Sequence, residues 1–206
     1  MPHCRMVMRF LFFRFRQKER KMKMKMKNKQ LYKICESAVL VALSVALTWV
    51  KIEIGAFGGS IDFVMIPLFI IAFRNGVGYG VASGLVFGFI KCLIGGGIGW
   101  GLPSVLLDYV LAYGAVGIAG LFKNKYWAIE LSTFLGCFAR FVIHFISGVT
   151  IYMITAPTEI ESIGATFANP VLYSIVYNAL YMLPNTIIAI VIMALLRYPL
   201  KKMKKI

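Results

Sequence analysis

A stripe of ionisable, small and aromatic residues crosses one long apolar segment of the chain. Within residues 134–152, four residues recur at intervals of four: Arg140, His144, Gly148 and Tyr152. On a helix this spacing places them on one slowly drifting face. A charged side chain at membrane depth costs about 2.5–3.5 kcal/mol on insertion scales, so it usually faces a protein interior or a cavity. We therefore interpret the stripe as one wall of a substrate cavity. The alternative is that Arg140 lies near the membrane surface and His144 is a hydrogen-bonded packing residue.

The composition is that of a membrane protein with several spans. The chain has 206 residues, 60% of them hydrophobic, and a mean hydropathy of +0.79. A soluble domain of this size could not bury so much apolar surface. At roughly 20 residues per span there is room for about six helices and little for a soluble domain. We predict an all-α integral membrane protein with six transmembrane helices, located in the cell membrane.

Six apolar segments are separated by short polar or glycine-rich loops, and each is expected to cross the membrane as a helix. They are Tyr32–Val50, Asp62–Phe73, Val77–Ile94, Val105–Phe122, Trp127–Ile154 and Val171–Arg197. The second segment is short and contains Pro67, which predicts a tilted or kinked helix. The loops 51–61 and 155–169 should lie outside the cell.

Three parts of the chain differ in composition. Residues 1–31 are basic, and we expect them to form a disordered cytoplasmic segment. Met22, Met24 and Met26 are each plausible start codons, so we interpret the residues before them as an artefact of start-site assignment. Residues 32–198 should form the six-helix membrane domain that binds substrate. Residues 199–206 form a basic cytoplasmic tail.

The basic residues predict the orientation of the chain in the membrane. Of the 23 lysines and arginines, 12 lie in residues 1–33, and most others follow the second, fourth and sixth segments. The expected outer loops hold only Lys51, while Lys91 and Arg140 are embedded. Because cytoplasmic segments carry the excess of positive charge, both termini should lie inside, N-in/C-in, with an even number of spans. The net charge of +15 therefore indicates topology and contact with anionic lipid, not nucleic-acid binding.

The chain lacks the residue sets that several kinds of chemistry require. Its four cysteines are scattered and form no CxxC, and with only two histidines they cannot make a His/Cys metal cluster. The glycine-rich run GGGIGWGLPS has no GxxxxGK[ST] pattern for nucleotide phosphates. An aspartate pair or Ser/His arrangement for an intramembrane enzyme is also missing. We therefore predict neither a cofactor nor an enzymatic activity.

Three segments bring polar and aromatic residues to a similar depth near the outer side. Beside the stripe, they contribute Asp108, Tyr109, Tyr173, Tyr177 and Asn178. A lone carboxylate among aromatic rings suits an organic cation, because it supplies counter-charge and the rings supply cation–π contacts. Hydrogen bonds from His144 and Asn178 can orient a heterocycle. Two alternatives stay open. In one, the tyrosines form an aromatic belt at the membrane–water interface, and in the other, Asp108 pairs with Lys91 or Arg140.

Residues 33–197 resemble the thiamine-specific substrate-binding (S) component of energy-coupling factor (ECF) vitamin transporters. The resemblance rests on Ala38, Ala42 and Ala46, the Tyr173…Asn178 pair and the passages GGSIDFVMIPLFIIAFRNG, LLDYVLAYGAVGIAGLF and ARFVIHFISGVTIY. It implies a six-helix protein that captures thiamine from outside. Uptake would be driven by two cytoplasmic ATPases through a transmembrane coupling subunit.

The resemblance also implies roles for individual residues. It places thiamine against Asp108, Tyr109, Arg140, His144, Tyr152, Tyr173 and Asn178. Some members have glutamate at the position of Asp108, and many have tryptophan at that of Tyr152. The alanines of the first span would dock on the coupling subunit, although their spacing alone suits internal packing equally well. The family also uses an aromatic residue from the first outer loop, a role for which Trp49 and Phe57 compete.

Two other transport functions fit the same residues. An S component for another vitamin or precursor would share the architecture and differ in its pocket. A stand-alone secondary transporter would use an ion gradient, and such proteins often contain internal repeats, which this sequence does not display.

Overall fold

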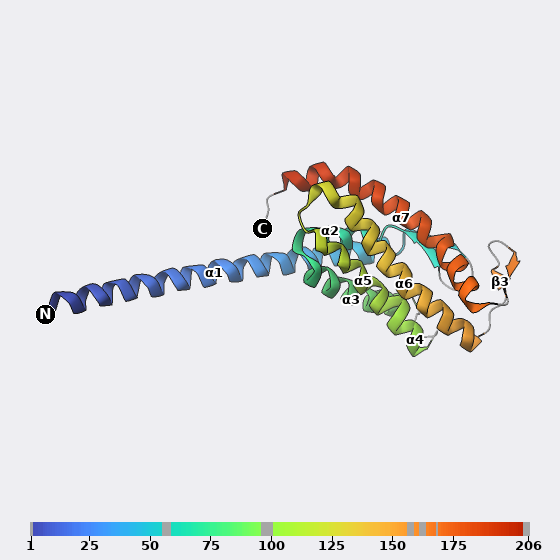
Figure 1. Cartoon of the computed structure of the whole chain (residues 1–206), viewed down its shortest axis with the longest axis horizontal. Coiled ribbons are helices and arrows are strands. Elements are labelled where there is room, and N and C mark those ends of the chain that lie inside the picture. Colours follow the sequence, from blue (N-terminus) through green and yellow to red (C-terminus); the bar gives the residue numbers. More distant parts are fainter. Residues whose placement is uncertain are drawn as a thin grey trace. The chain divides into compact units, whose positions relative to one another are not determined.

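The computed structural model describes residues 2–54, 59–95, 101–155, 159–160, 164–167 and 169–203. Figure 1 shows their helices and strands. Contacts between residues divide the chain into two units, one ending at Glu36 and one running from Ser37 to Lys205. The second unit holds nearly all of the predicted membrane domain.

Helix α1 runs from Pro2 to Leu47 and includes most of the first predicted span. We expected residues 1–31 to be disordered, whereas the structure draws them as helix from Pro2 onward. Lysine, arginine and methionine dominate this segment, and all three favour helix, which is the local reason for the difference. The cytoplasmic location of this segment stays a prediction.

Five described helical segments are long and apolar enough to cross a membrane. They are Met26–Leu47, Val77–Ile94, Leu102–Phe122, Tyr126–Thr150 and Pro170–Lys202. A shorter apolar helix, α2 (Met65–Asn75), occupies the second predicted span. At about 1.5 Å per residue, α2 reaches roughly half of a 30 Å hydrocarbon core. The helical membrane class is confirmed, while the count of six spans stays a prediction.

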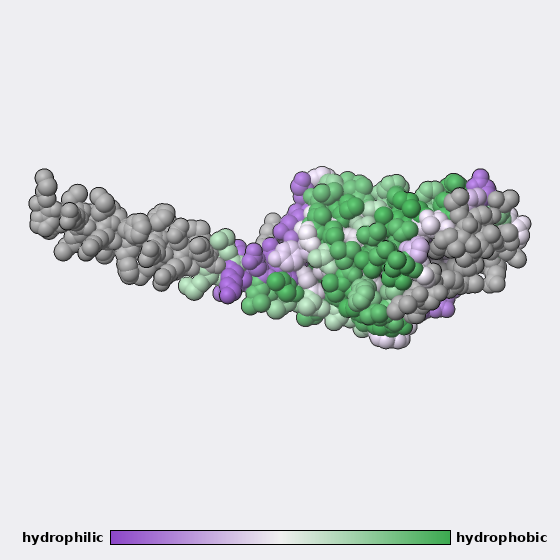
Figure 2. Space-filling model, turned by 90° about the horizontal axis from the view of Figure 1, so that it is seen from below, coloured by the Kyte–Doolittle hydropathy of each residue, from purple (hydrophilic) through white to green (hydrophobic). Residues whose placement is uncertain are grey.

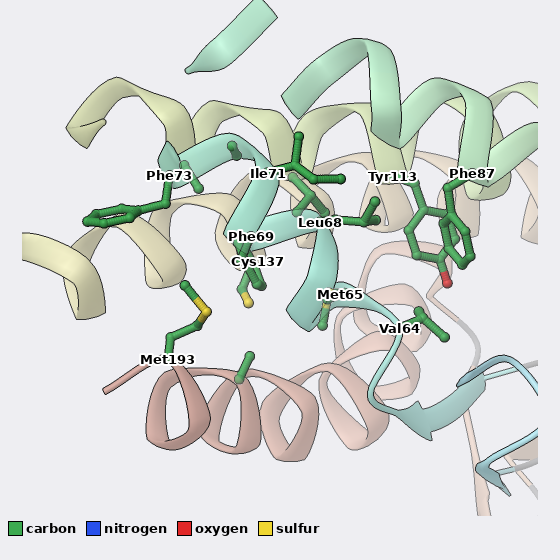
Figure 3. Packing of buried hydrophobic residues seen from close by; sticks show 14 of the residues in the cluster. Val64, Met65, Leu68, Phe69, Ile71, Phe73, Phe87, Tyr113, Cys137 and Met193 are labelled. Carbon is green, nitrogen blue, oxygen red and sulfur yellow. The ribbon is translucent and has the colours of Figure 1, made fainter. Parts of the chain in front are cut away.

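Helix α2 is buried among the other helices. In Figure 3 its Leu68 and Phe69 lie in the same core as Tyr113, Cys137 and Met193, which come from three other helices. Most residues of α2 are buried. A helix enclosed by protein does not need the full length of a lipid-facing span.

Pro67 does not interrupt α2. We placed the start of this helix at Asp62, which would put the proline in its interior. The helix begins instead at Met65, so Pro67 is its third residue and its missing N–H falls in the first turn, where no backbone hydrogen bond is lost. The proline is therefore no reason for a kink.

The fourth predicted span, Val105–Phe122, consists of three helical segments with different winding, and a short helical turn precedes them. The turn is α4 (Leu102–Ser104), and the three segments are the π-helix η2 (Val105–Leu111), α5 (Ala112–Ala115) and the 3₁₀-helix η3 (Val116–Phe122). The sequence predicted one regular helix here. Segment η2 contains Asp108 and Tyr109, and π-helical turns frequently occur at functional sites.

Helix α3 (Val77–Ile94) touches the fourth span through its backbone. A Cβ atom added to Gly84 would lie 2.1 Å from the carbonyl oxygen of Tyr113. One added to Gly117 would lie 2.2 Å from the backbone nitrogen of Val81. Only glycine permits such an approach. This contact fixes Tyr113 beside α3.

Helices α6 (Ile129–Thr155) and α7 (Pro170–Lys202) lie side by side along much of their length (Figure 1). The short 3₁₀-helix η4 (Tyr126–Ala128) precedes α6. Asn169 caps α7, because its side chain accepts a hydrogen bond from the Val171 backbone nitrogen at 2.8 Å. A Cβ atom on Gly148 of α6 would lie 2.3 Å from Ser174 Oγ of α7, so the glycine lets the two helices approach.

Two short antiparallel hairpins occupy regions predicted to be outer loops. Strands β1 (Lys51–Ile54) and β2 (Gly59–Asp62) pair with Lys51 opposite Asp62. Strands β3 (Glu159–Ile160) and β4 (Ala165–Thr166) form the second hairpin.

Large apolar side chains cover the outside of the helices. Phe89 is 55% exposed, Leu121 63% and Leu195 72%. Figure 2 shows hydrophobic residues over most of the described part of the face that it draws. An apolar surface of this extent is unfavourable in water and is expected against lipid tails.

Candidate functional site

A cavity of about 210 Å³ lies among the hairpin β1–β2, α3, the fourth span, α6 and α7. Six of the seven predicted site residues line it: Asp108, Tyr109, Arg140, His144, Tyr173 and Asn178. Gly148 lines it too, so three members of the stripe face one cavity, as its spacing predicts. The side chain of the seventh, Tyr152, lies outside the described residues. The structure thus brings these residues together, and their role in binding stays a prediction.

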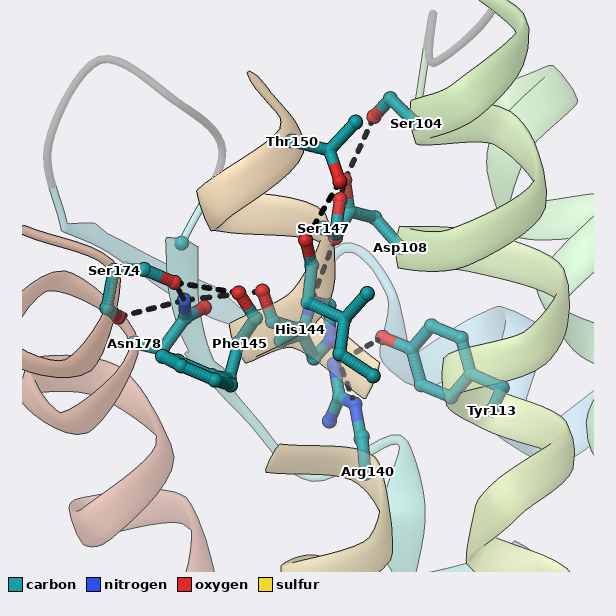
Figure 4. A network of polar contacts seen from close by, with 12 residues as sticks. Ser104, Asp108, Tyr113, Arg140, His144, Phe145, Ser147, Thr150, Ser174 and Asn178 are labelled. Atoms are coloured by element: carbon teal, nitrogen blue, oxygen red, sulfur yellow. Dashed lines mark hydrogen bonds and ion pairs between the residues drawn. The ribbon is translucent and has the colours of Figure 1, made fainter. Parts of the chain in front are cut away.

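The carboxylate of Asp108 is held by three neighbouring side chains (Figure 4). Its Oδ1 lies 2.9 Å from His144 Nδ1. Its Oδ2 accepts hydrogen bonds from Ser147 Oγ at 2.7 Å and from Ser104 Oγ at 2.9 Å. The side chain is 20% exposed, and it lines the cavity. In the described part of the chain its ion-pair partner is therefore His144. The alternative considered from the sequence, a pair with Lys91 or Arg140, is not formed there.

His144 connects Asp108 to Arg140. Its Nε2 accepts a hydrogen bond from Arg140 Nε at 3.3 Å, and a guanidinium group can only donate. A neutral imidazole in this position carries its hydrogen on Nδ1 and donates it to Asp108. This arrangement orients the carboxylate without neutralising it.

Arg140 belongs to a second polar cluster deeper among the helices. Its Nη2 donates to the Tyr113 hydroxyl at 3.0 Å, and its guanidinium carbon lies 4.3 Å from the centre of that ring. Arg140 is 5% exposed, so its side chain is enclosed by the helices and does not face lipid. Its Nη1 is buried and has no hydrogen-bond partner among the described residues.

Lys91 pairs with Asp62, a residue that sequence reasoning did not single out. Lys91 Nζ lies 2.9 Å from Asp62 Oδ2 and donates to the Tyr113 hydroxyl at 2.5 Å. Burial opposes ionisation of Asp62, but the charges of Lys91 and Arg140, with hydrogen bonds from Lys91 and Ser60, outweigh it and lower the pKa of this carboxyl group below its usual value. Asp62 and Lys91 are 29 residues apart, and no periodic pattern in the sequence connects them.

Three tyrosines of α7 form the aromatic side of the cavity. The rings of Tyr173 and Tyr177 are nearly parallel, with an angle of 4° and centres 5.8 Å apart. Tyr181 packs edge-on against His144 at 5.9 Å. Tyr173 is only 4% exposed and Tyr177 8%, so these rings form a buried wall and not an interface belt. Tyr177, which the sequence placed near the site without a binding role, and Tyr181, which it did not single out, also line the cavity. Their spacing of four and eight residues from Tyr173 was a usable signal.

The amide of Asn178 is largely committed to the junction of α6 and α7. Its Nδ2 donates to the backbone oxygens of Ser174 at 2.9 Å and His144 at 3.2 Å. Its Oδ1 accepts from the Tyr181 hydroxyl at 2.6 Å, which leaves one lone pair for a ligand. Figure 4 shows Asn178 beside Ser174 and His144.

Neither candidate aromatic residue of the first outer loop can be placed at the site. Trp49 is 67% exposed and is not among the cavity-lining residues, while Phe57 lies outside the described residues. Among the residues that the structure describes, no group of three His, Cys, Asp or Glu side chains could hold a metal ion.

Fold and site together define a class: a helical protein that crosses the membrane several times and has a cavity lined by the Asp108 carboxylate, buried cations and tyrosine rings. The family model described as "Thiamine transporter protein" matches residues 34–205. The thiamine transporter ThiT of Bacillus subtilis is 34% identical over 188 residues, covering 82% of this chain and 92% of the relative. ThiT of Lacticaseibacillus paracasei is 29% identical over 185 residues, covering 82% and 88%.

A solved structure of ThiT from Listeria monocytogenes has the same fold. It superposes with a TM-score of 0.70 at 22% identity and covers 83% of this chain and 96% of that one. Because the family model spans most of the sequence, the chain belongs to the thiamine transporter protein family. This confirms the resemblance seen in the sequence, the multi-pass location in the plasma membrane and the prediction of a transport protein that is not an enzyme.

Proposed function

We propose that this chain captures thiamine in the cavity and acts as the S component of an ECF transporter, whose ATPases drive uptake. The observation that carries the binding proposal is the carboxylate of Asp108. It faces the cavity, and its described contacts are one imidazole and two serine hydroxyls. Its negative charge is therefore available to a cationic ligand. Thiamine has a permanently cationic thiazolium ring and an aminopyrimidine ring.

The other walls suit the remaining parts of this ligand. The tyrosine rings of α7 offer faces for stacking and cation–π contact with flat rings. Arg140 lines the cavity, and its guanidinium group would donate a hydrogen bond to an acceptor atom of the ligand. Tyr109 and Tyr152 are included in the proposed site because the family uses these positions. Together these groups would favour an aromatic organic cation with hydrogen-bonding substituents.

The proposed topology has six spans with both termini inside. The distribution of basic residues supports it, and the enclosed helix α2 would serve as the second span. With this orientation the hairpin β1–β2 and the cavity beside it lie toward the outside of the cell. Residues 32–198 would then form the binding domain between two basic cytoplasmic ends.

The proposed contact with the coupling subunit uses the alanines of the first span. Ala38, Ala42 and Ala46 are exposed, whereas Val41 and Ser44 on the same helix are buried. This favours docking over packing within the bundle, because the alanine face of the helix is not the face that the bundle covers. A close-packed contact with another membrane helix suits such small residues.

A thiamine titration of the detergent-purified protein tests the binding proposal, with intrinsic tryptophan fluorescence as the signal. We expect saturable quenching by thiamine and none by riboflavin. Quenching by riboflavin alone would favour an S component for another vitamin. A folded protein that responds to neither would refute the proposed ligand class and leave the fold unaffected.

A further inference from the structure

The backbone of strand β2 is held by a side chain of helix α7. Asn185 Oδ1 accepts a hydrogen bond from the Asp62 backbone nitrogen at 2.9 Å, and its Nδ2 donates to the Ser60 backbone oxygen at 2.7 Å. These two backbone groups flank one residue of β2, and a residue on a neighbouring strand would bond to them in the same way. Asn185 is 1% exposed, so both bonds are shielded from water. The asparagine thus occupies the place of a third strand.

The hairpin depends on contacts of this kind. A two-stranded hairpin is marginally stable by itself, and β1 and β2 have four residues each. The Gly59 nitrogen donates to the Tyr177 hydroxyl at 3.1 Å, which adds a second bond from α7 to the strand. The ion pair between Asp62 and Lys91 joins its end to α3. In Figure 1 the hairpin lies beside α7, in agreement with these bonds.

The hairpin is also part of the cavity wall. The cavity lining includes Lys51 and Glu53 of β1 and Gly59 and Ser60 of β2, together with Asp108 and His144. The bonds of Asn185 are made to the strand that supplies this wall. Their loss would free the wall while leaving Asp108 and its three neighbours in place.

We propose that Asn185 is a positioning residue for ligand binding: it fixes the β1–β2 hairpin as a closed wall of the cavity and thereby slows release of the ligand. The proposal rests on the proposed thiamine site for its kinetic consequence. Its structural part, the hold on β2, does not depend on the identity of the ligand.

The test compares Asn185→Leu and Asn185→Asp with wild type and with Thr186→Val as matched control. Leucine has a similar volume and removes both bonds, whereas aspartate keeps the acceptor for the Asp62 nitrogen and loses the donor to Ser60. Thr186 is the next residue of α7, and its hydroxyl donates to the Met182 backbone oxygen within the helix. The measurements are the thiamine dissociation rate, hydrogen exchange of residues 59–62 without ligand, and the thermal midpoint.

We expect thiamine to leave the Asn185→Leu protein roughly tenfold faster or more, and the amides of β2 to exchange faster. Asn185→Asp should show changes in the same direction, because a carboxylate oxygen would face the Ser60 carbonyl oxygen, and Thr186→Val should match wild type. A purely structural role would lower the thermal midpoint and leave the dissociation rate of the folded fraction unchanged.

The proposal would be overturned if thiamine dissociation and amide hydrogen exchange in Asn185→Leu were as slow as in wild type. It would also be overturned if Thr186→Val accelerated both processes as much as Asn185→Leu does. If the leucine variant does not fold, unchanged release and exchange in Asn185→Asp would overturn it. If wild type does not bind thiamine, the proposed function fails, and the exchange measurement still decides whether Asn185 holds the hairpin.

Discussion

The carboxylate of Asp108 lies in a bundle of apolar helices with hydroxyls and an imidazole around it. Three contacts at 2.7–2.9 Å orient its oxygens, and each comes from a group that can be neutral. A lysine or arginine in the same place would cancel its charge. The buried cations lie instead around the Tyr113 hydroxyl, and Lys91 is paired with Asp62. Among the described residues, this separation leaves Asp108 without a lysine or arginine partner, so its charge can serve a cationic ligand.

Replacement of Asp108 by asparagine should weaken thiamine binding. The amide keeps the size of the side chain and removes the charge, so we expect a loss of about 1–3 kcal/mol, or roughly 5- to 150-fold in affinity. Equilibrium titration of purified protein measures it. Glu130→Gln is the control, because Glu130 pairs with Arg197 away from the cavity and should leave affinity unchanged. Equal affinity in Asp108→Asn and wild type would remove Asp108 from the site.

At the level of elements, direct contact between α3 and the fourth span positions Tyr113. Gly84→Ala should destabilise the protein by about 1–3 kcal/mol, because the new methyl group would meet a backbone oxygen that cannot rotate away. The matched control is Gly78→Ala in the same helix, where no atom lies within 4 Å of the added Cβ. Thermal unfolding in detergent compares them. Equal midpoints for the two variants would contradict the close approach.

The exposed alanine face of α1 gives a second prediction at this level. Ala42→Trp should leave thiamine affinity unchanged and abolish uptake by cells, because the indole ring would separate the helix from the coupling subunit. Leu195→Trp on α7 is the control. Leu195 is also apolar and is 72% exposed, but it lies on a different helix from the alanines. Normal uptake by the Ala42 variant would show that the alanines have no docking role.

For the whole molecule, binding and energy supply should be separable. We expect the purified chain to bind thiamine alone, while its uptake in cells requires the two ATPases and the coupling subunit. Uptake assays in cells that express the chain with and without an ECF module measure this. Transport that persists without the ATPases, and collapses when the ion gradient is dissipated, would favour a stand-alone secondary transporter.

Much of the fold and of the candidate site follows from local patterns. The apolar segments predicted the helices, since burial in lipid demands long apolar runs whatever their neighbours are. The four-residue spacing from Arg140 to Gly148 predicted a common face, and all three residues line one cavity. A short pairing segment was harder to detect. In the stretch 51–62 only residues 51–54 alternate polar and apolar, which is a short strand signal, and three glycines follow. Residues 59–62 form the partner strand because α7 and α3 supply contacts for β2.

The sequence by itself determined the membrane class, the approximate positions of the apolar helices and the residues that share the face of α6, because hydrophobicity and helical period act locally along the chain. Only the tertiary structure decided the partners of the charged groups. Asp108 pairs with His144, 36 residues away, and Lys91 with Asp62, because the helices and the strand that carry them are packed together. Buried charges are costly, so each takes the partner that packing brings within reach, and that distance is a property of the bundle as a whole.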